Sequence, residues 1–475
     1  MRHKSLFSFF LLSLLLPYPL RAQVADLAAH VRLKDSIVSR YNRGDFKGIY
    51  EFAGNDFRAE IKEQDFIAFM KRVNQAGPVQ SSTLSEDLGE VKYFKLRMPR
   101  IDLELRLSAS SAKQFNVFAI NRLDPYDTNY VKAIRSDNPL KTSFDSAIDL
   151  SVRKHMRNKS VSGLSIGIVK NGKTYKYNYG ETEKGKGQLP TSDTYYEIGS
   201  ITKTFTGTLL AQAVLDKKAG LQDDIRRHLK DSFPNLQYKG QPIRLVHLAN
   251  HTSGLPGLPA DFFNQSPYNP MNPYINYSRQ RWMQALHAVK LDTLPGTKHY
   301  YSNWGVSILG HILEQVYRDS YDELLARYIT GPMKMKDTKL SLQEKDKNRL
   351  AAGHTDKGKP TPRWDLIAFV PAGGIVSTVN DMVTYINHNI SKNLPAIKLA
   401  HQLTRGTYEN GNGLGWFTSK TLSGYTKYQH TGGTGGYSTT LAVIPELKAG
   451  YVILTNNSID LGNLSREVLH KLSKQ

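Results

Sequence analysis

The chain has 475 residues with 63 Lys or Arg and 42 Asp or Glu, giving a formal net charge of +21, and it contains no cysteine. The length predicts two or three domains, and the missing cysteine excludes disulfides, thiol catalysis and cysteine-bound zinc. The basic residues are dispersed and accompany no nucleic-acid-binding motif, so we expect no nucleic-acid partner. The charge instead favours a solvated surface, or association with a cell wall or an anionic membrane surface.

The N-terminal segment, residues 1–22, has the pattern of a signal peptide. Residues 2–4 are basic, residues 6–16 form an apolar run, and Ala22 offers a small residue for cleavage. The run is shorter than the roughly 18 apolar residues of a membrane-spanning helix. We therefore expect export to a bacterial periplasm or to the exterior.

Residues 27–125 form a predicted small α+β domain. Two segments with helical periodicity are followed by three with the alternation of strands, at 91–96, 103–107 and 115–121. This order resembles that of small cystatin-like or NTF2-like accessory domains. The domain contains no evident catalytic set, so we expect it to serve packing or partner binding.

The next segment, residues 126–142, is predicted to be a linker because of its Asn138-Pro139 turn signal. The remaining residues, 143–475, are predicted to open with a helix at about 144–157, followed by a hairpin around Asn171-Gly172. A second hairpin near residues 438–455 and a last helix at about 461–472 are predicted at the other end. Strands at both ends with helices between them predict one sheet built from both ends of this domain.

The motif with most chemical content is Ser200-Ile-Thr-Lys203, at the head of an apolar helical run. Residues i and i+3 share a helix face. A serine hydroxyl becomes a nucleophile when a neighbouring base removes its proton, and a lysine kept neutral by burial can be that base. Two other Ser-x-x-Lys matches, at 110–113 and 151–154, lack an apolar helix start after a glycine.

Two further motifs follow Ser200 in the chain. Tyr301 and Asn303 come after a Pro-Gly turn and precede an apolar helix, so the phenol can carry a proton and the amide can bind a carbonyl. A glycine-rich stretch, 430–436, then precedes a predicted strand. Its glycines allow close approach of a substrate, and its backbone N–H groups can stabilise an oxyanion.

The order Ser-x-x-Lys, Tyr-x-Asn, His-Thr-Gly resembles that of the serine β-lactamase and penicillin-binding-protein-like hydrolases, the branch with class C β-lactamases and D-Ala-D-Ala carboxypeptidases. The resemblance covers about residues 143–475. It implies an α+β, β-lactamase/transpeptidase-like fold, in which an antiparallel sheet flanked by helices is joined to an all-helical lobe. It also implies an enzyme without cofactor or metal.

The resemblance implies a role for each motif residue. Ser200 would be the nucleophile, Lys203 its base and Tyr301 the general acid/base. The oxyanion hole would combine the N–H groups of Ser200 and Gly433. The substrate-binding residues would be Asn303, His430, Thr431 and Gly432.

The resemblance leaves the substrate open. Class C β-lactamases typically have lysine where this chain has His430, so we expect a peptidase or amidase acting on D-amino-acid peptides of the cell wall. A carboxylesterase, a β-lactamase, and a non-catalytic peptide- or wall-binding protein on the same fold are the alternatives. We interpret His247, His251 and His299 as framework or surface residues. Substrate choice is expected to depend on loops such as residues 255–277.

Overall fold

The computed structural model describes residues 26–88, 91–122, 128–421 and 423–473. The predicted signal peptide, residues 1–22, lies outside these residues. The chain divides into two compact units with the boundary between residues 127 and 128. Within the described ranges, no helix is long and apolar enough to cross a membrane.

The first unit consists of four helices followed by a four-stranded antiparallel sheet in the order β1-β2-β3-β4. The predicted helices and all three predicted strands are present, and β1 is an additional, mostly exposed strand that the sequence did not suggest. The elements are α1 (Leu27–Asn42), α2 (Phe46–Glu51), α3 (Asn55–Glu60), α4 (Glu63–Val73), β1 (Ser81–Leu88), β2 (Val91–Arg97), β3 (Leu103–Ser111) and β4 (Gln114–Arg122).

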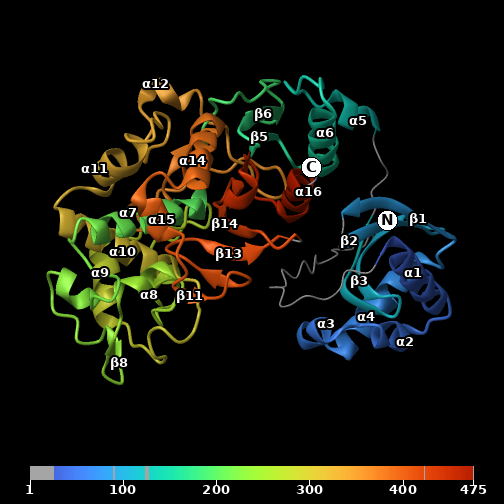
Figure 1. The fold of residues 1–475 in the computed structure, drawn as a ribbon, viewed down its shortest axis with the longest axis horizontal. Coiled ribbons are helices and arrows are strands. Elements are labelled where there is room, and N and C mark those ends of the chain that lie inside the picture. Colours follow the sequence, from blue (N-terminus) through green and yellow to red (C-terminus); the bar gives the residue numbers. More distant parts are fainter. Residues whose placement is uncertain (1–25, 89–90, 123–127, 422, 474–475) are drawn as a thin grey trace. The chain divides into compact units, whose positions relative to one another are not determined.

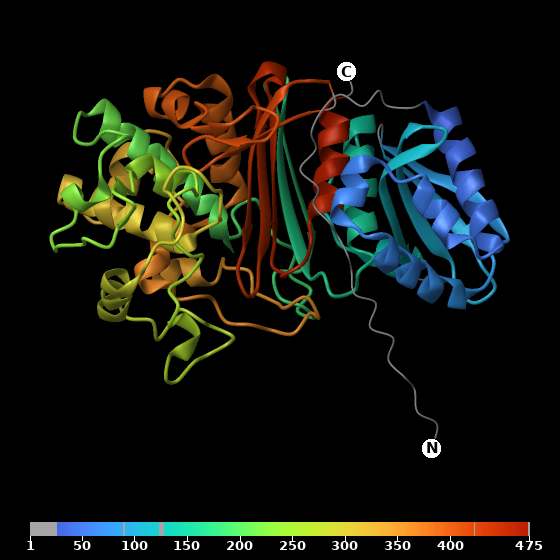
Figure 2. The same ribbon diagram turned by 90° about the horizontal axis from the view of Figure 1, so that it is seen from below.

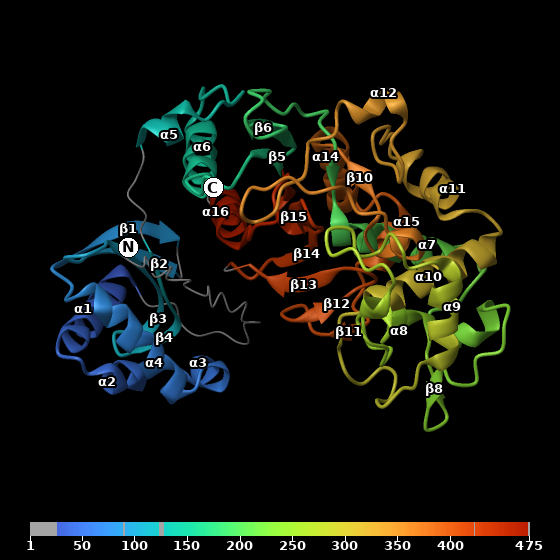
Figure 3. The ribbon, with the colours of Figure 1, turned by 180° about the vertical axis from the view of Figure 1, so that it is seen from behind.

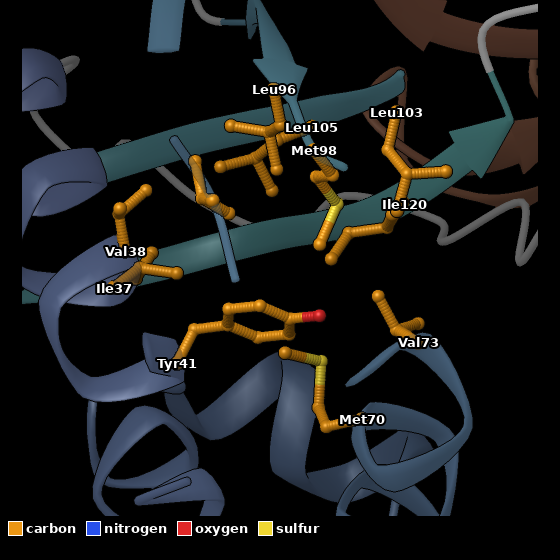
Figure 4. A pocket seen from close by; sticks show the side chains of 11 residues that line it. Ile37, Val38, Tyr41, Met70, Val73, Leu96, Met98, Leu103, Leu105 and Ile120 are labelled. Atoms are coloured by element: carbon orange, nitrogen blue, oxygen red, sulfur yellow. The ribbon is translucent and has the colours of Figure 1, made fainter. Parts of the chain in front are cut away.

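The core of the first unit lies between its helices and its sheet. A cavity of about 10 Å³ lies there, and its lining is apolar apart from one phenol. Figure 4 shows Tyr41 and Met70 facing the strand side chains across this space. The Tyr41 hydroxyl donates to the Gly77 carbonyl at 3.1 Å. The lining therefore offers packing surface but no group of reactive side chains.

The second unit is built on an eight-stranded antiparallel sheet in the order β11-β12-β13-β14-β15-β16-β5-β6. The last strand in sequence, β16, pairs with the first strand of the unit, β5, and aligns Thr455 with Leu164. The prediction of one sheet built from both ends is therefore confirmed. The strands are β5 (Gly163–Lys170), β6 (Lys173–Gly180), β11 (Arg405–Gly406), β12 (Gly411–Asn412), β13 (Phe417–Lys420), β14 (Thr426–Gly433), β15 (Ser438–Ile444) and β16 (Ala449–Thr455).

The hairpin of β5 and β6 turns at the predicted Asn171-Gly172 pair. Both residues have positive φ, 53° and 76°. Positive φ at both central positions is required by the tight turn that matches strand twist, and Asn and Gly adopt it at least cost.

Helices cover both faces of this sheet, as Figure 2 shows with the strands seen edge-on. Helices α6 (Ser143–His155) and α16 (Gly462–Ser473) pack together over one face. Helix α14 (Val379–Ser391) packs on β5 and β16 from the other face. A short helix, α5 (Thr128–Ala133), occupies part of the segment expected to be a linker.

A helical lobe lies beside the sheet and comes from the middle of the chain (Figure 3). Its central helix α7 is buried almost all round, and Gly207 on it leaves no room for a side chain against the Leu414 carbonyl. The helices are α7 (Thr202–Leu215), α8 (Leu245–Ala249), α9 (Arg279–Ala288), α10 (Asn303–Tyr317), α11 (Tyr321–Leu325), α12 (Glu344–Lys347), α13 (Val370–Gly373) and α15 (Pro395–Ala400). Two-residue strands form the pairs β7 (Tyr196–Glu197) with β10 (Val376–Ser377), and β8 (Gln237–Tyr238) with β9 (Gln241–Pro242).

Candidate active site

Ser200 lies where β7 passes into the buried helix α7, on a single 3-10 turn formed by Gly199–Ile201. Figure 1 labels helix α7 in the second unit. Gly199 has φ of +51°, and a Cβ on it would lie 2.6 Å from the Gly433 nitrogen. Glycine is needed there for both reasons. This close approach places the Ser200 turn directly against the end of β14.

The Lys203 amine reaches Ser200 from one helical turn further along. Its Nζ is 2.8 Å from Ser200 Oγ and donates to the Ala372 carbonyl at 2.5 Å. Lys203 is fully buried, and the described part of the chain contains no carboxylate paired with it. Burial lowers the pKa of Lys203 well below its usual value. A neutral amine in hydrogen-bond contact with a hydroxyl can remove its proton.

Tyr301 completes this group from the loop before α10. Lys203 Nζ lies 4.9 Å from the centre of its ring. Burial raises the pKa of Tyr301, and the neighbouring Ser200 hydroxyl offsets this in part. The phenol is therefore protonated at neutral pH and stands beside the Ser200 hydroxyl as a proton donor. The next motif residue, Asn303, begins α10, and its side chain interacts with the Tyr274 hydroxyl.

Two histidines that we interpreted as framework or surface residues lie close to Tyr301. The His251 ring is 4.4 Å from the Tyr301 ring, and its Nδ1 accepts from the Ser302 N–H at 3.2 Å. His299 lies 5.8 Å from His251, and burial lowers the pKa of both. His251 has φ of +62°, a conformation uncommon for histidine that the sequence does not reveal. The third one, His247, caps α8 by accepting from the Arg244 N–H at 3.1 Å.

The glycine-rich motif lies at the end of β14. His430 is buried, and its Nδ1 donates to the Thr431 carbonyl at 2.6 Å. Burial, with a contribution from nearby Lys203, lowers the pKa of His430 to about 3, so the ring is neutral. It can bind a substrate by hydrogen bonding but supplies no positive charge. A Cβ on Gly432 would overlap the Ile198 carbonyl, so this strand end also packs directly against the segment before Ser200.

A cavity of about 40 Å³ lies beside Ser200. It brings together Ser200, Asn303 and Gly433, whereas Lys203, Tyr301, His430, Thr431 and Gly432 do not line it. The other lining residues are Tyr274, Trp364, Leu366, Phe369, Ala372, Gly373 and Thr434. The sequence did not indicate Trp364 or Phe369, because both come from a segment with little regular structure that reaches the site only through the fold.

The fold and this arrangement of serine, lysine and tyrosine define an active-site serine hydrolase of β-lactamase/transpeptidase-like architecture. The family model described as Beta-lactamase matches residues 148–467. The chain belongs to the β-lactamase family, and the predicted fold class and enzyme class are thereby confirmed.

Several known proteins resemble this chain over its second unit. A protein named β-lactamase from Pseudomonas fluorescens is 27% identical and covers 67% of this chain and 94% of its own length. The D-alanyl-D-alanine-carboxypeptidase/endopeptidase AmpH of Escherichia coli is 26% identical over 63% of this chain and 80% of its own. The solved β-lactamase/D-alanine carboxypeptidase from Yersinia pestis, complexed with citrate, is 26% identical with a TM-score of 0.60, covering 70% of this chain and 99% of its own. A class C β-lactamase structure superposes with a TM-score of 0.62 at 23% identity, covering 71% and 98% of the two chains.

Proposed function

We propose that the protein hydrolyses D-amino-acid peptides or amides through an acyl-enzyme on Ser200. The observation that carries the proposal is the 2.8 Å contact between Ser200 Oγ and a fully buried Lys203 amine. The similarity to AmpH, whose name states a D-alanyl-D-alanine carboxypeptidase, supports this substrate class.

The proposed reaction uses each motif residue in turn. Lys203 takes the Ser200 proton as Oγ bonds to the substrate carbonyl carbon, and the N–H groups of Ser200 and Gly433 stabilise the oxyanion. The bond to the leaving amine then breaks, and the proton passes through Tyr301 to the amine nitrogen. Water next attacks the ester carbonyl, which releases the acid and returns a proton to Ser200. Asn303 would bind the carbonyl side of the substrate.

A carboxylesterase is the second candidate, and the neutral His430 favours it. A carboxypeptidase binds a substrate with a free carboxylate, which a cation recognises best. His430 is uncharged, and the cavity beside Ser200 is lined by no charged side chain. An ester with a neutral leaving group requires no such cation. A β-lactamase remains the third candidate within the family, and a binding protein without turnover would leave the buried lysine without a role.

The test is intact-mass spectrometry of the protein mixed with a fluorescent penicillin, beside the Ser200→Ala variant. A stable adduct on the wild type and none on the variant supports the serine mechanism, and D-Ala-D-Ala peptides are the next substrates. Equal labelling of both proteins contradicts it. A wild type that is neither labelled by the penicillin nor hydrolyses it, but that cleaves small acyl esters through Ser200, favours the carboxylesterase.

We also propose that the protein is exported and that catalysis and attachment are divided between its domains. Residues 143–475 would carry catalysis, while residues 27–125 would hold the enzyme to a cell wall or to a membrane surface. The basic start, the apolar run and the absence of reactive side chains from the described cavity lining of the first unit support this. Deleting residues 27–125 should reduce sedimentation with isolated walls but leave ester turnover intact. Unchanged sedimentation contradicts the attachment role, and a cellular protein that retains residues 1–22 contradicts cleavage.

A further inference from the structure

His251 is hydrogen-bonded to the chain on both sides of Tyr301. Its carbonyl accepts from the Tyr300 N–H at 2.8 Å, and its ring Nδ1 accepts from the Ser302 N–H at 3.2 Å. Because Nδ1 accepts, the proton of the neutral ring is carried by Nε2. One residue from the segment after α8 therefore fixes the backbone immediately before and immediately after the phenol.

The His251 ring also packs against the Tyr301 ring. The ring centres are 4.4 Å apart, and the planes are tilted by 35°. Phe417 extends this packing, with its ring centre 6.1 Å from that of His251 and 6.4 Å from that of Tyr301. Lys203 Nζ lies 4.9 Å from the Tyr301 ring centre. A shift of the His251 side chain would therefore move the phenol relative to the Lys203 amine.

The backbone of His251 adopts a conformation that histidine rarely takes. Its φ is +62°, in the left-handed region, where Gly and Asn are accommodated at least cost. Such a residue persists where its surroundings over-determine it, and such residues cluster at functional sites. Burial, with contributions from Lys203 and two histidines, lowers the pKa of His251 well below its usual value, so the ring is neutral and Nδ1 can accept. The turn thus brings two acceptors of one residue against the loop that carries Tyr301.

We propose that His251 is a positioning residue that holds the Tyr301 hydroxyl in place for proton transfer to the leaving group. In the proposed reaction this hydroxyl gives its proton to the leaving atom and regains one from the Lys203 ammonium. The two hydrogen bonds and the ring contact fix the phenol before a substrate binds, and a displacement of about 1 Å can cost about 10²-fold in rate. The inference rests on the proposed acyl-enzyme mechanism and adds to it a residue that acts through Tyr301.

The test uses acetate esters that share an acyl group but have p-nitrophenol, phenol or ethanol as the leaving group. A p-nitrophenolate departs without a proton, whereas ethoxide needs one as the C–O bond breaks. His251→Gly accommodates the left-handed backbone but removes both the Nδ1 acceptor and the ring. We expect it to lower kcat/KM by about 10²-fold for the ethyl ester and by less than about threefold for the p-nitrophenyl ester, with the phenyl ester between them.

His251→Asn is the rescuing variant. Asn also tolerates the left-handed backbone, and its Oδ1 can replace Nδ1 as the acceptor for the Ser302 N–H. We expect it to recover at least about tenfold of the ethyl-ester rate that His251→Gly loses. Retained turnover of the p-nitrophenyl ester shows that a variant folds with Ser200 and Lys203 intact. If the glycine variant does not fold, His251→Leu, which fills the space without an acceptor, takes its place.

His401→Ala is the matched control for a purely structural loss. His401 is 1% exposed, its ring centre lies 4.0 Å from that of Tyr428, and its Nε2 hydrogen-bonds to the Asn389 side chain. It is thus a second buried histidine stacked on a tyrosine. This variant should lose stability but keep the wild-type ratio of the ethyl-ester rate to the p-nitrophenyl-ester rate.

Tyr301→Phe separates the inference from the mechanism. It should show the same dependence on the leaving group as His251→Gly, with a loss at least as large. If Tyr301→Phe shows that loss but the folded His251 variants keep the wild-type ratio, the role of His251 is overturned and the mechanism stands. If Tyr301→Phe also keeps the ratio, the proposed proton transfer is contradicted, and the role of His251 with it.

Discussion

The chain contains the Ser-x-x-Lys spacing in helix α6 and again at the start of α7, and the two copies differ in what surrounds the lysine. On α6, Lys154 forms an ion pair of 3.1 Å with Glu467, and Ser151 donates to the Ala147 carbonyl. On α7, Lys203 has Ser200 Oγ and the Ala372 carbonyl as its neighbours. The same four-residue spacing thus yields a charged structural lysine in one helix and a neutral amine in the other.

Two buried carboxyl groups repeat this contrast. Glu467 is 3% exposed and has Lys154 as its partner. Glu197 is 4% exposed, and burial raises its pKa to about 7 although Arg363 lies 3.3 Å away. Glu197 also accepts from the Trp364 N–H at 3.1 Å, yet burial still has the larger effect on its pKa. Such perturbed groups are typical of functional sites, where burial adjusts protonation for chemistry.

The largest expected effect is on the reaction rate. Lys203→Met should lower kcat/KM for ester hydrolysis by about 10²–10⁴-fold, the usual contribution of a general base. Lys154→Met is the matched control and should retain wild-type rates. Steady-state kinetics with both variants checks this contrast, and comparable losses in the two would remove the distinction between the lysines.

The next effect concerns stability and its pH dependence. In the unfolded chain, Lys203 keeps its proton up to a pH near its ordinary pKa of 10.5. In the folded chain burial lowers this pKa, so the amine loses its proton at a much lower pH. The wild type should therefore gain stability relative to Lys203→Met as pH rises toward 10.5. Urea unfolding of both proteins from pH 7 to 10 measures this, and parallel stabilities across the range would argue for a charged Lys203.

The stability that Glu197 contributes should depend on pH in the opposite direction and fall as pH rises. Its pKa is raised from 4.5 to about 7, so the folded protein holds a proton that the unfolded chain releases above pH 4.5. This contribution is fully present below pH 4.5 and is lost as pH rises through 7, with a total of roughly 3 kcal/mol. Glu197→Gln should remove the slope. Urea unfolding at pH 5 and pH 8 tests it, and a slope that persists in the variant would assign it to another group.

The smallest effect is expected at the paired lysine. Lys154→Met leaves the buried Glu467 without its ion pair, and we expect a loss of about 1–3 kcal/mol in the free energy of unfolding. The Lys154 side chain is 23% exposed, so solvent moderates the cost. A double variant with Glu467→Leu should recover most of the loss. Thermal unfolding of the three proteins would contradict this account if the single variant were as stable as the wild type.

Local signals were sufficient for much of the fold. The Asn171-Gly172 turn has the expected backbone, and the apolar strands β5 and β16 pair to join both ends of the second unit in one sheet. Strand β1, Ser81–Leu88, escaped prediction because its sequence is polar and lacks alternation. It is fixed by pairing with β2 rather than by its own side chains.

The motif residues near Ser200 could be identified from spacing and order, but the shape of the site could not. His251 reaches Tyr301 only because the chain turns through a left-handed conformation after α8. Trp364 reaches the cavity through hydrogen bonds to Glu197 and Met271, which are 167 and 93 residues away in sequence. Such contacts depend on the completed fold and have no local pattern.

The most direct test of the account is an NMR titration of Lys203 in protein labelled with ¹³C at lysine Cε, assigned by the loss of one resonance in Lys203→Met. The account predicts that the Lys203 amine is already neutral while the exposed lysines are still charged, and that it titrates well below their usual pKa of about 10.4. A Lys203 resonance that titrates together with the exposed lysines would contradict the assignment of Lys203 as the base for Ser200.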